Sequence, residues 1–130
     1  MNTMELAQCL SNGVVCYENR EESLAECPWV PHPSFEGVHL KHLIKGADTG
    51  GQLSCHLVRV EPGKALQSHT HEGQWELHEV VEGQGTARLG ETEIPYHPGR
   101  MTVIPQNAPH SVQAGDQGVV LLAKFFPALV

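Results

Sequence analysis

Hydrophobic and polar positions follow two different patterns along this chain. Near the start, Leu6 and Leu10 lie four residues apart, which predicts a short helix over residues 3 to 12. The acidic residues 17 to 28 that follow predict no regular element, and several prolines come after them. We expect residues 1–34 to form an N-terminal arm that packs against the rest of the chain or against a partner subunit.

From Gly37 onward, short apolar stretches recur between turn residues, and Gly90 lies at the centre of a predicted hairpin. Short stretches of β-branched and aliphatic residues at this spacing are typical of an all-β sandwich or barrel. The predicted strands cover residues 38–43, 53–60, 67–71, 76–82, 86–89, 92–94, 101–104, 111–113 and 119–126.

Composition fits one ordinary globular domain. The chain has 130 residues, of which 40% are hydrophobic, so it can bury a core without disulfides. Its net charge of −7 argues against nucleic acid and against anionic membrane surfaces as partners. The start of the sequence lacks the basic and apolar stretches of a signal peptide, and no apolar run approaches the length needed to span a bilayer. We therefore expect a cytoplasmic protein whose four cysteines are free thiols.

The sequence contains a His-x-His pair, His69 and His71, and a carboxylate, Glu76, five residues after it. On a β-strand, side chains at i and i+2 point to the same face, so such a pair aims two imidazoles at one point. The pair alone is ordinary in a chain with 9 histidines. Together with Glu76 and a distant histidine, His110, it could close a metal site.

These residues carry a resemblance to the cupin superfamily, in particular to small single-domain bacterial cupins. The first cupin motif, G-x5-H-x-H-x3-4-E-x6-G, matches residues 63–83 at every fixed position. In the second motif, G-x5-P-x-G-x2-H-x3-N, Asn107 replaces a glycine and Ala114 replaces the asparagine. Asn is the non-glycine residue that best tolerates a positive φ, and Ala114 removes a turn side chain rather than a ligand. The positions that match in the second motif are Gly99, Pro105 and His110.

The resemblance implies a fold, an assembly and a metal site. The fold is an all-β double-stranded β-helix, or jelly-roll barrel, over residues 35–130, with a short N-terminal helical arm. The assembly is a homodimer. The implied site holds one divalent transition metal per chain, and this donor set admits Fe, Mn, Ni, Co, Cu or Zn. An octahedral metal would keep two open positions for water, dioxygen or a bidentate ligand. The implied metal ligands are His69, His71, Glu76 and His110.

Other side chains could take part in chemistry at this site. His78 lies two residues past Glu76 and should face the barrel interior if no bulge intervenes, either to relay protons or as a hydrogen-bonded core histidine. In the strand before the motif, either His56 or Arg59 faces inward. For catalysis we expect Glu76 or His78 to accept a proton.

Three functions stay open. The first is a metal-dependent enzyme, of dioxygenase or isomerase type, that acts on a small oxo or enol compound. The second is a module that binds or senses a small ligand without turnover. The third is a metal-loaded structural barrel.

Overall fold

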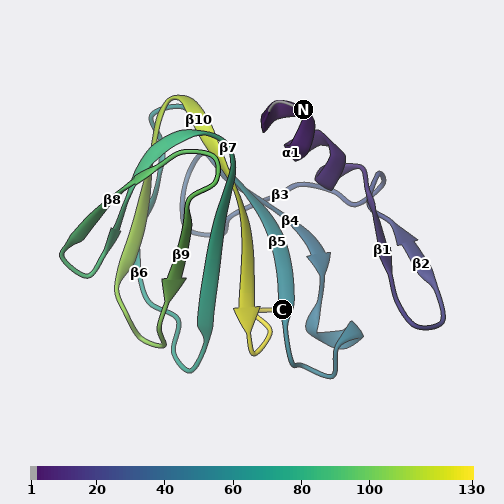
Figure 1. Ribbon diagram of the computed structural model, residues 1–130. Helices are drawn as coiled ribbons and strands as arrows, with labels where there is room; N and C mark the ends of the chain where they lie inside the picture. Colours follow the sequence, from purple (N-terminus) through teal and green to yellow (C-terminus); the bar gives the residue numbers. More distant parts are fainter. Residues whose placement is uncertain (1–2) are drawn as a thin grey trace.

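The chain folds into an antiparallel jelly-roll barrel with a helix and a small hairpin beside it (Figure 1). The computed structural model describes residues 3–130, and their side chains from residue 6 onward. The all-β jelly-roll class predicted from the sequence is confirmed. In chain order the elements are α1 (Thr3–Ser11), β1 (Val14–Cys16), β2 (Glu21–Ser23), β3 (Val30–Pro31), β4 (Val38–Ile44), the 3₁₀ helix η1 (Gly46–Asp48), β5 (Ser54–Val60), β6 (Ala65–His69), β7 (Trp75–Leu89), β8 (Thr92–Tyr96), β9 (Met101–Ile104) and β10 (His110–Phe126).

The two longest strands, β7 and β10, join the parts of the barrel. The main sheet has the order β3-β4-β5-β10-β7-β8, with β6 paired to β10 and β9 paired to β7. The first part of β10 pairs with β6, and its last part pairs with β5. The sequence predicted each long strand as two separate ones, and that expectation is wrong because the chain bends without leaving the ladder.

The bend depends on glycines at which the strands cross closely. The β7–β10 register shifts between Ala114 and Val119. A Cβ atom built on Gly83 would lie 2.1 Å from the carbonyl oxygen of Gly118, and Gly83 has a φ of +76°. Both the contact and the backbone conformation therefore require glycine at this motif position.

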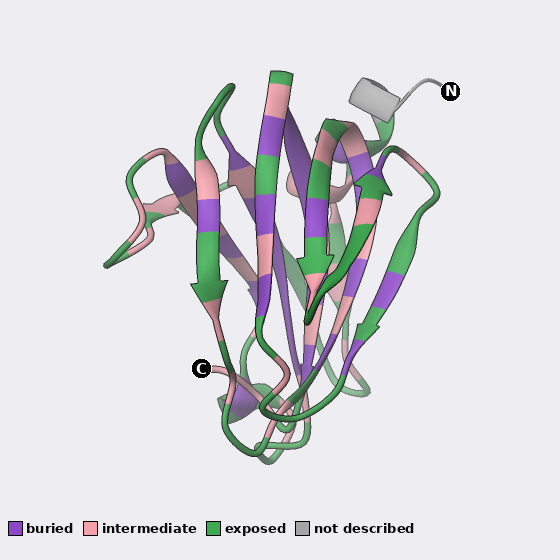
Figure 2. Cartoon of the chain, turned by 90° about the vertical axis from the view of Figure 1, so that its left-hand side faces the viewer, coloured by how far each residue is buried: buried purple, intermediate pink, exposed green. Residues whose placement is uncertain are grey.

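The barrel sheet is covered on both faces, which gives the molecule two apolar cores. One fills the barrel interior and includes Val58, Leu121 and Phe125. The other lies on the outer face, where Leu57 and Val120 pack under the N-terminal arm. Strand β5 therefore has almost no exposed residue, whereas strands with one free face alternate between buried and exposed positions (Figure 2).

The N-terminal arm packs on the outer face of β4, β5 and β10. Ala7 of α1 and Leu24 share the outer core with these strands. The buried Lys41 donates from Nζ to the backbone oxygen of Ser11 at 2.5 Å and to its hydroxyl at 3.0 Å. A lysine at this position satisfies a free carbonyl at the end of α1 and complements the helix dipole. The helix predicted over residues 3 to 12 is observed, whereas strand β2 forms inside the stretch expected to be irregular.

Candidate metal centre

Three histidines from two parts of the chain meet at one end of the barrel. His69 ends β6 and pairs in register with His110, the first residue of β10. Their ring centroids lie 4.2 Å apart, and the ring of His71 lies 5.0 Å from that of His69. One nitrogen from each ring lies within 4.8 Å of the other two, so these three residues could hold a metal ion.

His71 reaches this cluster from a turn and not from the strand. Strand β6 ends at His69, so the expectation that both histidines share one strand face is wrong. The amide N–H of Asn107 donates to the carbonyl of His71 at 3.1 Å and thereby ties this turn to the loop before β10. Asn107 has a φ of 66° and is the one non-glycine residue of the described chain with a positive φ, which confirms why Asn can replace the motif glycine.

Backbone carbonyls fix the proton positions on two of the three rings. The Nδ1 of His69 lies 2.6 Å from the carbonyl oxygen of Gln67, and the Nδ1 of His110 lies 3.0 Å from that of Ala108. A carbonyl only accepts, so each Nδ1 carries the hydrogen. When such a ring is neutral, its Nε2 therefore carries no hydrogen and offers a lone pair. This tautomer can bind a metal ion through Nε2.

Glu76 brings a buried carboxylate against the cluster. Its Oε1 lies 3.0 Å from Nε2 of His110 and 3.5 Å from Nε2 of His71. Despite the short distance, neither Glu76 Oε1 nor His110 Nε2 has a hydrogen-bond partner of acceptable geometry among the described residues. Either a proton on His110 Nε2 or a cation held by both atoms would satisfy this buried pair. The donor set therefore fits a divalent transition metal held by imidazoles and an adjacent carboxylate.

Burial and charge set the protonation of these groups. Burial lowers the pKa of His69 to about 4 and also lowers the pKa of His71, so both rings are neutral near pH 7. Burial opposes ionisation of Glu76, but the charge of His78 and hydrogen bonds from His110 and His78 outweigh it and hold the carboxyl pKa well below its usual range. Burial likewise opposes protonation of His110, and its interactions with Glu76 and the Ala108 carbonyl outweigh burial and raise its pKa.

His78 faces the interior, as its spacing from Glu76 predicted, and it begins a buried chain of hydrogen bonds. Its Nε2 lies 2.8 Å from Oε2 of Glu76, and its Nδ1 lies 2.8 Å from the hydroxyl of Tyr96. The Tyr96 hydroxyl in turn donates to Oγ1 of Thr102 at 3.0 Å. This chain fixes the orientation of the Glu76 carboxylate. The sequence did not point to Tyr96 or Thr102, because nothing in it gives the register between β7, β8 and β9.

A cavity of about 50 Å³ lies beside the histidines, enough for a few water-sized groups. Apart from site residues, its walls are largely apolar and include Phe125, together with Leu129 from the C-terminal segment. Leu129 is held there by its backbone N–H, which donates to the hydroxyl of Ser54 at 2.8 Å. His32, from the loop after β3, also lines this cavity.

His56 is the inward residue of β5, and Arg59 lies on the outer face. Both ring nitrogens of His56 are engaged: Nδ1 lies 2.8 Å from Nδ1 of His42, and Nε2 lies 2.8 Å from the hydroxyl of Ser54. Burial and the neighbouring His42 lower the pKa of His56 to about 4. His56 thus presents its ring carbons to the cavity as a neutral wall, with neither nitrogen free for a metal.

Comparisons with known proteins agree with this fold. The sequence profile of the family described as Cupin domain matches residues 56–124, so the chain belongs to the cupin family. No curated protein matches the sequence. Within the described residues, no helix is long and apolar enough to cross a membrane.

Solved structures with the same fold have different functions. A predicted oxalate decarboxylase from Thermotoga maritima has a TM-score of 0.72 and 19% identity, over 79% of this chain and 95% of that protein. An RmlC-like cupin from Shewanella frigidimarina has a TM-score of 0.69 and 17% identity, over 81% of this chain and 87% of its own. The polyketide cyclase RemF from Streptomyces resistomycificus has a TM-score of 0.67 and 20% identity, over 79% of this chain and 75% of its own. At these identities the likeness shows the fold alone.

Proposed function

We propose that the protein is a metal-dependent cupin enzyme, of dioxygenase or isomerase type, that acts on a small oxo or enol compound. The observation that carries this proposal is the buried pair formed by Glu76 Oε1 and His110 Nε2, beside His69 and His71. Neither atom has a hydrogen-bond partner of acceptable geometry among the described residues. Three imidazoles and one carboxylate would hold a divalent transition metal there, with the ion in place of any proton on His110 Nε2. When bound, such a metal supplies Lewis acidity at an oxygen atom of the ligand.

The cavity indicates the size and polarity of the ligand. Leu66, Phe125 and Leu129 give it apolar walls, and the histidine cluster gives it one polar end. A compact compound with an oxygen-bearing end toward the histidines and a hydrocarbon part against these walls fits this arrangement. Because both nitrogens of His56 are engaged, the cavity wall offers little further polar recognition on that side.

The chain's own groups can hold a proton close to such a ligand. Glu76 contacts His110 through Oε1 and His78 through Oε2, so it connects the histidine cluster to the buried chain that ends at Thr102. A proton taken up by the carboxylate can be shared with His78, whose other nitrogen contacts the Tyr96 hydroxyl. On this basis we assign the role of proton acceptor to Glu76, and to His78 when its ring is neutral.

One observation favours a second candidate, a cupin that binds or senses a small ligand without turnover. The pKa of Glu76 lies well below its usual range because of the charge of His78 and the hydrogen bonds of His110 and His78, even though burial opposes this. A carboxylate with so low a pKa is a weak base at neutral pH. The homodimer and the cytoplasmic location expected from the sequence stay predictions in both cases.

The variant Glu76→Gln separates the two candidates. The protein is loaded with each candidate metal and screened for oxygen uptake and substrate absorbance with small diketones and 2-oxo acids. If Glu76 accepts the proton, Glu76→Gln at full metal loading should lower turnover about 10²–10⁴-fold. Glu79→Gln is the matched control. The Glu79 carboxylate lies outside the histidine cluster and forms an ion pair with Nζ of Lys124 at 2.6 Å.

Two results would go against this proposal. Wild-type turnover in metal-loaded Glu76→Gln would remove Glu76 from the chemistry and leave His78 as the base to test. Ligand binding without turnover of any compound by the loaded wild type, with equal affinity in Glu76→Gln, would establish the binding module.

A further inference from the structure

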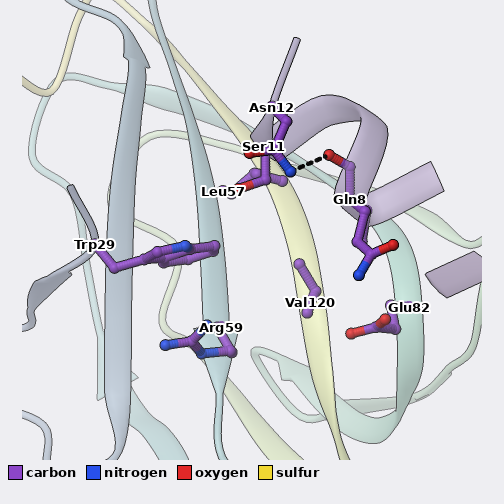
Figure 3. Close-up of a pocket in the computed structure, with 9 residues that line it drawn as sticks. Gln8, Ser11, Asn12, Trp29, Leu57, Arg59, Glu82 and Val120 are labelled. Atoms are coloured by element: carbon purple, nitrogen blue, oxygen red, sulfur yellow. Dashed lines mark hydrogen bonds between the residues drawn. The ribbon is translucent and has the colours of Figure 1, made fainter. Parts of the chain in front are cut away.

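A second pocket, of about 230 Å³, lies on the outer face of the barrel sheet beneath the end of α1 (Figure 3). Its floor is formed by Leu57 of β5 and Val120 of β10. Side chains alternate between the two faces of a strand, so this pocket and the histidine cluster are on opposite sides of the sheet. The two sites share no residue.

The pocket holds two opposite charges that do not pair with each other. Arg59, Val120 and Glu82 form one row across three neighbouring strands, because Val120 is in register with both of the others. Two strand spacings separate the backbones of Arg59 and Glu82 by about 10 Å. Within the part of the chain whose side chains are described, neither the guanidinium of Arg59 nor the carboxylate of Glu82 has an ion-pair or hydrogen-bonding partner.

Trp29 keeps the two charges apart. The guanidinium of Arg59 stacks on the Trp29 ring at 4.4 Å from its centroid, which directs it away from Glu82. The Glu82 carboxylate lies across the pocket from that stack, beyond Val120, and the amide of Gln8 extends from α1 above Glu82 (Figure 3). The pocket thus has a cationic side, an anionic side, a neutral amide above and an apolar floor at Val120.

We propose that this outer pocket binds a small zwitterion of the amino-acid type, with its carboxylate toward Arg59 and its ammonium group toward Glu82. The hydrocarbon part between the two charges would lie over Val120, where the floor is apolar. A simple anion would leave the Glu82 charge facing it without compensation, and a simple cation would do the same with Arg59. A ligand with both charges satisfies both sides at once.

The probe is 4-aminobutyrate, with butyrate and propylammonium as matched ligands that each lack one charge. Binding is followed by NMR at the indole N–H of Trp29, and the exposed Trp75 on β7 is the internal control. We expect 4-aminobutyrate to shift the Trp29 resonance in a saturable manner and to leave that of Trp75 unchanged. Butyrate and propylammonium should bind at least about tenfold more weakly, because each lacks one charge-assisted contact.

Variants test the same assignment from the protein side. Arg59→Gln and Glu82→Gln should each weaken 4-aminobutyrate binding about tenfold or more. Arg88→Gln and Glu93→Gln are matched controls. These two exposed residues form an ion pair on β7 and β8, with 3.8 Å between Nη2 of Arg88 and Oε2 of Glu93. Both control variants should bind 4-aminobutyrate as the wild type does. His69→Ala should also retain binding, because its side chain belongs to the other face of the sheet.

Any of three results would overturn the proposal. The first is the absence of a Trp29 shift in the wild type at about 10 mM 4-aminobutyrate, a generous concentration for a ligand of this size. The second is binding of butyrate or propylammonium as tight as that of 4-aminobutyrate. The third is unchanged affinity in both Arg59→Gln and Glu82→Gln; the ligand comparison in the wild type decides the question if either variant fails to fold.

Discussion

The hydroxyl of Tyr96 provides a measurable test of the buried chain that orients Glu76. Tyr96 is 2% exposed, and its hydroxyl contacts Nδ1 of His78 and Oγ1 of Thr102. Tyr96→Phe removes only this oxygen and keeps the ring in the core. The His78 nitrogen and the Thr102 hydroxyl, both buried, then lose a partner that water cannot easily replace.

The size of the effect follows from the two contacts. A buried polar group left without its hydrogen bond costs about 1–3 kcal/mol. Two groups lose their partner here, so we expect Tyr96→Phe to lower the free energy of unfolding by about 2–6 kcal/mol. The loosened His78 would also hold Glu76 less firmly. Mutation of a residue that hydrogen-bonds to a metal ligand typically lowers metal affinity about 10–100-fold. The Tyr96 hydroxyl reaches Glu76 only through His78, so we expect a loss of metal affinity near the lower end of this range.

Urea denaturation of the metal-free protein measures the stability change, and Tyr17→Phe is the matched control. The chain contains two tyrosines, and the Tyr17 hydroxyl is buried without a hydrogen-bond partner among the described residues. Its removal should therefore change stability by less than about 1 kcal/mol. Equal losses in Tyr96→Phe and Tyr17→Phe would refute the assigned role of the Tyr96 hydroxyl.

Two further predictions concern pH and assembly. His56 has a pKa of about 4 in the folded protein and 6.5 ordinarily, so the unfolded chain binds more protons between these values, and stability falls as the pH drops through that range. The total contribution of His56 to this pH dependence is about 3 kcal/mol. The free energy of unfolding should therefore differ less between pH 7 and about pH 4 in His56→Gln than in the wild type. An equal difference in the two proteins would contradict the prediction. The second prediction is a homodimer in solution, the commonest closed assembly. Light scattering that reports only the 14.2 kDa mass of one chain would count against the dimer.

Much of the fold and of the site was predictable because the residues involved have local requirements. Gly83 must be glycine where two strands cross, and Asn107 adopts the positive φ of its turn. Short stretches between turn residues likewise predicted the barrel strands. These features depend on the backbone close to each residue, and the sequence pattern carries that information.

The remaining features depend on which strands lie side by side, which a single sequence does not specify. His71 was expected on a strand, yet β6 ends two residues earlier. His32 reaches the cavity, and Tyr96 reaches His78, only through long-range packing. The outer pocket also depends on how the N-terminal arm lies on β5 and β10, which periodicity cannot predict.

The most direct test of the metal centre is elemental analysis of protein purified without chelator and then dialysed against each candidate metal. We predict about one bound ion per wild-type chain. His69→Ala and His71→Ala should lose most of it while retaining the β-sheet circular dichroism of the fold. His97→Ala, which changes an exposed turn histidine, should bind metal as the wild type does. Wild-type metal content in both His69→Ala and His71→Ala would contradict the histidine cluster as the metal centre.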